Sequence, residues 1–160
     1  MNASQPHPRG SLRSLSAEDV PGVRALVAES SGAAQWSAEA YAQLLETQSP
    51  ARALVLREEQ RIVGFIAIRV VAEEAEILNL AVVASRRRKG HGTRLLAAAE
   101  EFARSRGASQ LFLEVRESNS SAVAFYEARG FARAGLRRNY YQQPPEAAVL
   151  MTRKITAVPG

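Results

Sequence analysis

Arg87-Arg88-Lys89-Gly90-His91-Gly92 is the most informative segment of this chain. It lies between an apolar run at residues 77–83 and an amphipathic segment at residues 93–106, so we expect a strand, a basic glycine loop and a helix. A helix start leaves backbone N–H groups without intrahelical partners, and the helix dipole adds partial positive charge there. Arg86 extends the loop to four consecutive cations. The pattern favours a site for phosphate or pyrophosphate, although paired glycines also occur in ordinary tight turns.

The spacing of the glycines excludes two common phosphate-binding loops. A P-loop needs a Lys-Ser or Lys-Thr pair, and none follows Gly92. The dinucleotide-binding fingerprint needs a third glycine where Leu95 stands. The loop therefore matches neither of these two motifs.

The composition predicts one domain with one core. The chain has 160 residues, of which 46% are apolar, and we expect a single domain over residues 11–155. Residues 1–10 are polar with two prolines and lack the apolar region of a signal peptide, so they predict a disordered tail. Residues 156–160 predict a short C-terminal tail. We expect a monomer in the cytoplasm.

The composition also restricts the chemistry. The chain has no cysteine and two histidines, which argues against a metal centre, and no apolar run is long enough to span a membrane. The net charge of +5 suggests an anionic partner: a phosphorylated cofactor, a nucleic acid or an acidic protein surface. An arginine-rich protein without such a partner is the alternative.

Hydrophobic periodicity predicts an α/β fold with a mixed sheet. We expect helices after the capping residues Ser16 and Ser37. Two further helices are predicted at residues 90–106 and 119–129. Strands are predicted at residues 11–15, 53–57, 62–71, 76–83, 110–116, 131–141 and 147–155. The strands at residues 76–83 and 110–116, joined by a helix, require a parallel crossover.

Three polar side chains could carry chemistry. Glu114 lies within an apolar strand, and alternation favours a solvent-facing carboxylate over a general base in a cleft. Tyr126 stands beside Phe125, so it either packs in the core or donates a proton to a leaving thiolate. Asn119 either caps a helix or forms a hydrogen bond with a cofactor.

Three aromatic residues are candidates for substrate contacts. Trp36 precedes a helix, and a tryptophan there serves either as a packing anchor or as a ligand contact. Tyr140 and Tyr141 are neighbours on a predicted strand. Successive strand residues point to opposite faces, so we expect one of the two tyrosines to line any given cleft.

Together these motifs resemble the GNAT superfamily of acetyltransferases. The motifs are the glycine loop, Leu113-Glu114-Val115-Arg116, Asn119, Ala124-Phe125-Tyr126-Glu127 and Gly130-Phe131. The chain is most similar to the RimI type, the bacterial ribosomal-protein alanine N-acetyltransferases. That likeness includes Trp36-Ser37, Asn79-Leu80-Ala81-Val82 and Arg137-Arg138-Asn139-Tyr140-Tyr141. The resemblance covers about residues 11–155.

The resemblance implies a sheet of about seven strands with flanking helices, whose parallel central strands splay apart to admit acetyl-CoA. It implies that the backbone of Leu80, Ala81 and Val82 holds the acetyl and pantetheine portion. It implies that the pyrophosphate is held by Arg87, Arg88, Lys89, Gly90, His91 and Gly92. Asn119 and Tyr126 contact the cofactor, with Glu114 as general base and Tyr126 as general acid. Trp36, Tyr140 and Tyr141 then contact the substrate.

The implied substrate is the N-terminal α-amino group of a protein, possibly a small-subunit ribosomal protein. Two departures from the family pattern, Arg86 for a tyrosine and Arg87 for glutamine, make the loop more cationic. Alternative substrates are a lysine side chain and a small-molecule amine. A nucleic-acid-binding module is a less favoured alternative, since aromatic residues are only 6% of the chain and form no stacking series.

Overall fold

The structure is a computed structural model that describes residues 10–30, 32–87, 90–142 and 144–156. The predicted loop residues Arg88 and Lys89 lie outside the described residues, as does most of each predicted tail.

The described residues form an α/β fold with a mixed sheet, which confirms the predicted fold class. The sheet order is β1-β2-β3-β4-β5-β7-β6. The strands are β1 (Ser11–Ser14), β2 (Ala51–Glu58), β3 (Arg61–Val71), β4 (Glu74–Val82), β5 (Gln110–Arg116), β6 (Ala132–Gln142) and β7 (Pro145–Lys154). The helices are α1 (Val20–Ala28), α2 (Ala38–Leu44), α3 (His91–Ser105) and α4 (Ser120–Glu127), with 3₁₀ turns η1 (Ala17–Asp19) and η2 (Ala84–Arg86).

The chain divides into two compact units. The first comprises Met1–Ala67 and Asn79–Ala99, and the second comprises Ile68–Leu78 and Glu100–Gly160. Strands β3 and β4 and helix α3 each contribute residues to both units.

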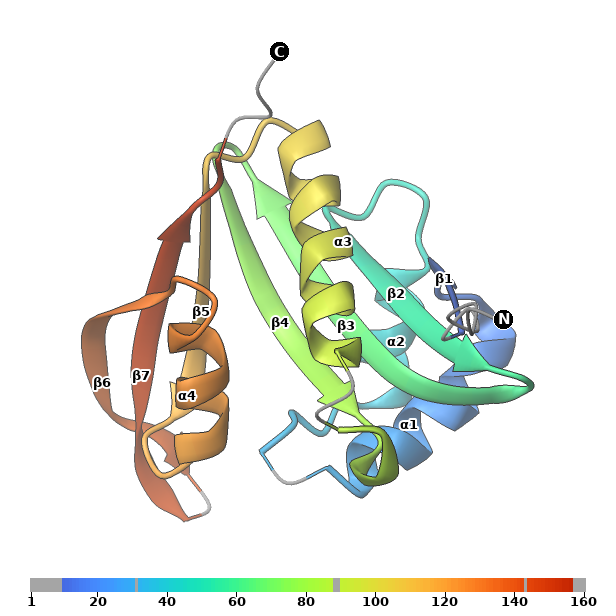
Figure 1. The fold of residues 1–160 in the computed structure, drawn as a ribbon, viewed down its shortest axis with the longest axis horizontal. Coiled ribbons are helices and arrows are strands. Elements are labelled where there is room, and N and C mark those ends of the chain that lie inside the picture. The colour runs from blue at the N-terminus through green and yellow to red at the C-terminus, as the bar shows by residue number, and fades with distance from the viewer. Residues whose placement is uncertain (1–9, 31, 88–89, 143, 157–160) are drawn as a thin grey trace, which may run out of the picture. The chain divides into compact units, whose positions relative to one another are not determined.

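In the first unit, β3 is covered on both faces. Helices α1 and α2 lie on one side of β2 and β3, and the N-terminal half of α3 lies on the other (Figure 1). Phe65 packs against Tyr41 of α2, with ring centroids 6.1 Å apart. A Cβ at the neighbouring Gly64 would come within 2.8 Å of the Leu95 side chain on α3. An alanine at position 64 would therefore require the Leu95 side chain to shift.

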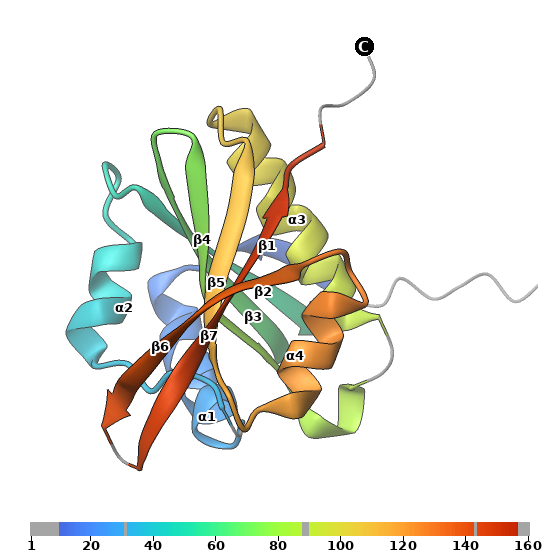
Figure 2. The same cartoon turned by 90° about the vertical axis from the view of Figure 1, so that its left-hand side faces the viewer.

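In the second unit, β5 pairs with strands of both directions. It runs parallel to β4, with Glu74 opposite Gln110, and antiparallel to β7, with Glu114 opposite Leu150. Strands β6 and β7 form an antiparallel hairpin (Figure 2). The parallel β4–β5 pair confirms the predicted crossover. Burial alternates along β5, so Leu111, Leu113 and Val115 are buried as the period-2 pattern requires.

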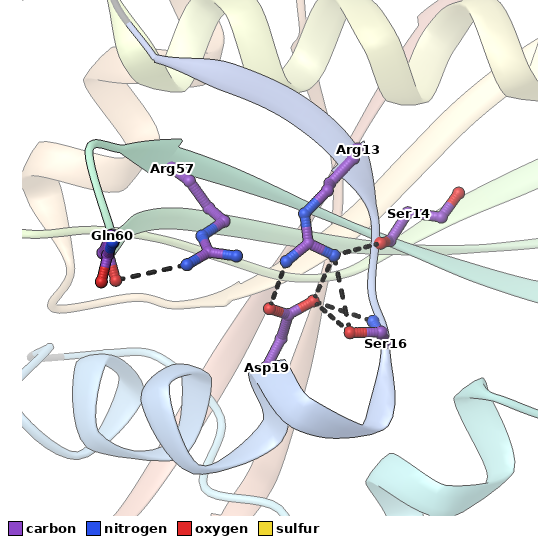
Figure 3. A network of polar contacts seen from close by, with 6 residues as sticks. All are labelled: Arg13, Ser14, Ser16, Asp19, Arg57 and Gln60. Atoms are coloured by element: carbon purple, nitrogen blue, oxygen red, sulfur yellow. Dashed lines mark hydrogen bonds and ion pairs between the residues drawn. The ribbon is translucent and has the colours of Figure 1, made fainter.

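The entry to α1 is fixed by a polar network around Asp19 (Figure 3). Ser16 is the N-cap predicted from the sequence, but the turn that it caps is η1, which leads into α1. Asp19 accepts hydrogen bonds from the Ser16 amide at 2.9 Å and from both terminal nitrogens of Arg13 at 2.6 and 2.9 Å. Burial alone would raise the pKa of Asp19, but the hydrogen bonds from Ser16 and Arg13 together lower it.

We expect Asp19→Asn to lower the free energy of unfolding by about 1–3 kcal/mol at pH 7, because a buried acceptor of charged hydrogen bonds is lost. The folded pKa lies below the unfolded value of about 3.9, so the carboxylate contributes fully above that pH. Its contribution is lost as the pH falls through the folded pKa, and the two proteins should converge in acid. Urea denaturation from pH 7 down to pH 2, with the exposed Glu18→Gln as control, measures this. Equal stabilities at pH 7 would contradict the prediction.

Candidate functional site

The glycine loop leads from the end of β4 to the start of α3. The Arg94 amide donates to the Gly90 carbonyl at 3.0 Å, so Gly90 is the N-cap and α3 begins at His91, one residue later than predicted. Gly90 has φ of +83°, a left-handed conformation that favours glycine, and a Cβ there would meet nothing within 4 Å. The start of α3 therefore has the backbone geometry of an anion site beside open space.

The arginine at the described edge of this loop is held by the strand that precedes it. Arg87 is exposed, and its Nε donates to the Val82 carbonyl at 3.3 Å. The two terminal nitrogens of the guanidinium take no part in this contact. The predicted pyrophosphate role of Arg87 stays a prediction.

Glu58, at the end of β2, joins the two flanks of the loop, although it lies just outside the strand predicted at residues 53–57. Its Oε2 accepts from Arg86 Nε at 2.6 Å, and its Oε1 lies 2.9 Å from His91 Nε2. Burial alone would raise the pKa of Glu58, but Arg86 and His91 together lower it. His91 is only 3% exposed, and its predicted cofactor contact stays a prediction.

We expect Glu58→Ala to lower the free energy of unfolding by about 1–3 kcal/mol, because it removes the carboxylate that lies 2.9 Å from Nε2 of the buried His91. The Arg86 pair adds less, because that side chain is 42% exposed. Urea denaturation at pH 7 measures the change. The control is Glu101→Ala, which removes an exposed ion pair with Arg104 on α3. A change no larger than that of the control would mean that Glu58 does not brace the loop.

The last residues of β4 alternate in burial. Asn79 and Ala81 are buried, whereas Leu80 and Val82 are half-buried. The Asn79 side chain forms hydrogen bonds with the backbone of Ala34, in the segment before α2. This segment also contains Trp36. The Trp36 ring lies 5.6 Å from Tyr41 and 6.2 Å from Phe65, so the packing role for this tryptophan is observed. Trp36 is half-buried, which leaves part of its surface for a substrate.

Glu114 on β5 does not face solvent, so the interpretation that alternation favoured is wrong. Its side chain is 11% exposed, and its Oε1 lies 3.2 Å from Arg137 Nε on β6. Its Oε2 is buried and has no hydrogen-bond partner among the described residues. Arg137 comes from two strands away, because β7 lies between β5 and β6. A buried carboxylate oxygen without a partner is what a general base needs to accept a proton.

Tyr126 on α4 is buried between aromatic rings, as the packing interpretation predicted. Its ring lies 5.0 Å from Phe125 and 5.3 Å from Phe131. Burial raises the pKa of Tyr126, and the nearby Arg129 opposes that effect only in part. The hydroxyl therefore stays protonated at neutral pH, as a general acid requires.

Asn119 caps α4, which is the simpler of its two predicted roles. Its Oδ1 accepts from the Ala122 amide at 3.2 Å and from the Ser121 hydroxyl at 3.2 Å. Its predicted cofactor contact stays a prediction.

Alternation predicted that Tyr140 and Tyr141 lie on opposite faces of a strand. In the structure the two side chains contact each other. Their rings are in edge-to-face contact with centroids 5.0 Å apart. The strand register shifts between Arg137 and Tyr141, and Asn139 has φ of +56°, so regular alternation is broken there. Arg116 stacks over the Tyr141 ring at 4.1 Å. Burial raises the pKa of Tyr140, and the charge on Glu114 raises it further.

The predicted site residues fall into two groups. The first unit contains the described loop residues, the end of β4 and Trp36. The second unit contains Glu114, Asn119, Tyr126, Tyr140 and Tyr141. Within the described residues, no three histidines or carboxylates are grouped so as to hold a metal ion. No helix in the described part of the chain is long and apolar enough to cross a membrane.

The order of these features along the chain matches a known family. Residues 20–131 match the acetyltransferase (GNAT) family. The chain belongs to this family. The resemblance seen in the sequence is thereby confirmed, and GNAT acetyltransferases use acetyl-CoA.

Proteins with similar sequences and structures include enzymes of the RimI type. The chain is 40% identical over 105 residues to the [ribosomal protein bS18]-alanine N-acetyltransferase of Salmonella typhimurium, covering 64% of this chain and 71% of that protein. It is 30% identical over 143 residues to a putative enzyme of the same name from Bacillus subtilis, covering 89% and 94%. The crystal structure of the ribosomal-protein-S18-alanine N-acetyltransferase from Escherichia coli superposes with a TM-score of 0.79 at 31% identity, covering 93% and 96%.

A second solved structure shows a similar fold. Ard1 from Thermoplasma volcanium superposes with a TM-score of 0.81 at 28% identity, covering 93% of this chain and 99% of that one. The GNAT fold of this acetyltransferase therefore extends over nearly its whole length.

Proposed function

We propose that this acetyltransferase transfers the acetyl group of acetyl-CoA to the N-terminal α-amino group of a protein, with the alanine terminus of a small-subunit ribosomal protein as its substrate. The observation that carries the proposal is the 30–40% identity to enzymes named for that reaction, one of which the chain covers over 94% of its length. We further propose that it acts as a monomer in the cytoplasm.

The glycine loop is proposed to bind the diphosphate of the cofactor. The helix start at His91, which follows the left-handed Gly90, and the exposed Arg87 support this role, because N-terminal N–H groups and a cation both favour an anion. We propose that this site binds the cofactor without a metal. Backbone groups of Leu80, Ala81 and Val82 are proposed to hold the pantetheine and acetyl portions.

Glu114 is proposed to deprotonate the substrate amine, directly or through a water. An α-amino group has a reference pKa of about 7.7–8.0, so on the order of a tenth to a sixth is uncharged at pH 7. Only the neutral amine can attack a carbonyl. The partnerless Oε2 of Glu114 supports this role, while Arg137 holds the other oxygen in place.

The amine then attacks the acetyl carbonyl directly, without a covalent enzyme intermediate. The C–N bond forms as the C–S bond breaks, and Tyr126 gives its proton to the departing thiolate. The acylated nitrogen then releases its second proton to solvent, from which Tyr126 is reprotonated. A backbone N–H near Val82 is proposed to stabilise the oxyanion. Most of the acceleration comes from positioning the two substrates, because the thioester is already reactive.

The test is a panel of acceptors with thiol release from acetyl-CoA as the readout. The panel contains peptides that differ in their first residue, an N-acetylated peptide that carries a lysine, and a polyamine. The proposal predicts fastest release with an alanine-first peptide and background release with the blocked peptide. Preferred turnover of the blocked peptide or the polyamine would overturn it in favour of lysine or small-amine acetylation.

A further inference from the structure

Asn79 is a buried polar side chain with an unusual set of partners. It is 6% exposed and lies on β4 directly before the predicted cofactor-binding residues Leu80, Ala81 and Val82. Its Nδ2 donates to the Ala34 carbonyl at 3.0 Å, and its Oδ1 accepts from the Ala34 amide at 3.3 Å. One side chain thus satisfies both backbone groups of a residue 45 positions away in the sequence.

Ala34 belongs to the non-helical segment between α1 and α2, which we define as residues 33–37 and call the α1–α2 segment. Neighbours of Ala34 are also tied down. The Gln35 side chain donates to the Val27 carbonyl of α1 at 2.8 Å, and the Trp36 ring packs on Tyr41 and Phe65. A segment without helix or strand bonds keeps one conformation only if such side-chain contacts hold it.

The geometry points to Asn79 as a positioning residue that sets the affinity for the acceptor by holding the α1–α2 segment, and with it Trp36, against β4. This inference rests on the proposed function, in which Trp36 contacts the acceptor and the backbone after Asn79 holds acetyl-CoA. The Asn79 side chain holds the α1–α2 segment, whereas only the backbone connects Asn79 to residues 80–82. A change of the side chain should therefore disturb the acceptor contact and leave the cofactor contact largely intact.

The alternation of β4 explains why a change at Asn79 should affect the acceptor contact and not the cofactor contact. Asn79 and Ala81 point to the buried face, where Asn79 meets Ala34. The proposed cofactor contacts of residues 80–82 are made by backbone groups, which keep their position when a side chain on the strand changes. The position of Trp36 depends instead on the two hydrogen bonds to Ala34.

The test uses the single tryptophan of the chain as an internal probe. In Asn79→Ala and Asn79→Asp, we expect the KM for an alanine-first peptide to rise about tenfold, the effect of one or two net hydrogen bonds. The KM for acetyl-CoA should stay within about twofold. Trp36 emission should shift to the red in the folded variants, and a peptide should quench it only at higher concentrations. Asn79→Asp has the size of the natural side chain and guards against a variant that fails to fold.

Ser30→Ala serves as the matched control, since it removes one buried hydrogen bond, to the Leu26 carbonyl of α1, without touching Ala34. It should lower the melting temperature and leave both KM values unchanged. If the Asn79 variants behave as this control does, Asn79 is merely structural and the inference is overturned. If the wild-type protein acetylates no peptide, the proposed function fails. The fluorescence of Trp36 then still reports whether Asn79 holds the segment.

Discussion

Glu114→Gln is expected to lower kcat at neutral pH by about 10²- to 10⁴-fold, the range for loss of a general base. Glutamine has nearly the size of glutamate and can keep a hydrogen bond to Arg137, so the packing of β5 should survive. What is lost is the buried Oε2, which has no partner among the described residues and is free to take a proton. Steady-state rates with an alanine-first peptide, from pH 6 to pH 9, measure the effect.

Acetyl-CoA affinity separates this effect from damage to the fold. The dissociation constant from calorimetry should be nearly that of the wild type in Glu114→Gln. Glu117→Gln changes an exposed glutamate just after β5 and should retain full activity. A Glu114→Gln protein with full activity and an unchanged pH profile would remove Glu114 from the mechanism.

Tyr126→Phe is expected to lower kcat by about 10²-fold, because the leaving thiolate loses its proton donor. The aromatic packing on Phe125 and Phe131 should persist, since phenylalanine keeps the ring. Burial raises the pKa of Tyr126, so its hydroxyl does not ionise as the pH rises from 7 to 10, and it causes no fall in kcat over that interval. Single-turnover kinetics with saturating peptide isolate the chemical step.

Tyr41→Phe provides the control for this substitution. Tyr41 is a buried core tyrosine whose hydroxyl has no hydrogen-bond partner among the described residues. Its loss should leave the single-turnover rate unchanged. If Tyr126→Phe also turns over at the wild-type rate, the Tyr126 hydroxyl has no part in the chemical step and its role is packing.

The fold could be predicted because its signals are local. The apolar period of β4, the glycines of the loop and the helical period of α3 each occupy neighbouring residues, and together they require a parallel crossover. The remaining boundary differences are small. For example, α3 begins at His91, because Gly90 has a left-handed φ of +83° and so lies outside the helix.

The surroundings of the site residues could not be predicted, because they depend on partners far away in the sequence. Alternation placed Glu114 away from the buried face of β5, but Arg137 reaches it from beyond β7. The same holds for Glu58, whose contact with Arg86 spans 28 residues. No residue type or spacing in the sequence signals these ion pairs. The contact between Tyr140 and Tyr141 depends on a register shift that a period-2 pattern does not contain.

Fragmentation mass spectrometry of a product peptide shows which nitrogen the enzyme acetylates. The peptide begins with alanine, carries one internal lysine and is incubated with the enzyme and acetyl-CoA. The proposed function predicts a single acetyl group, located on the N-terminal α-nitrogen. An acetyl group on the lysine, or no acetylation under conditions where acetyl-CoA is bound, would contradict it.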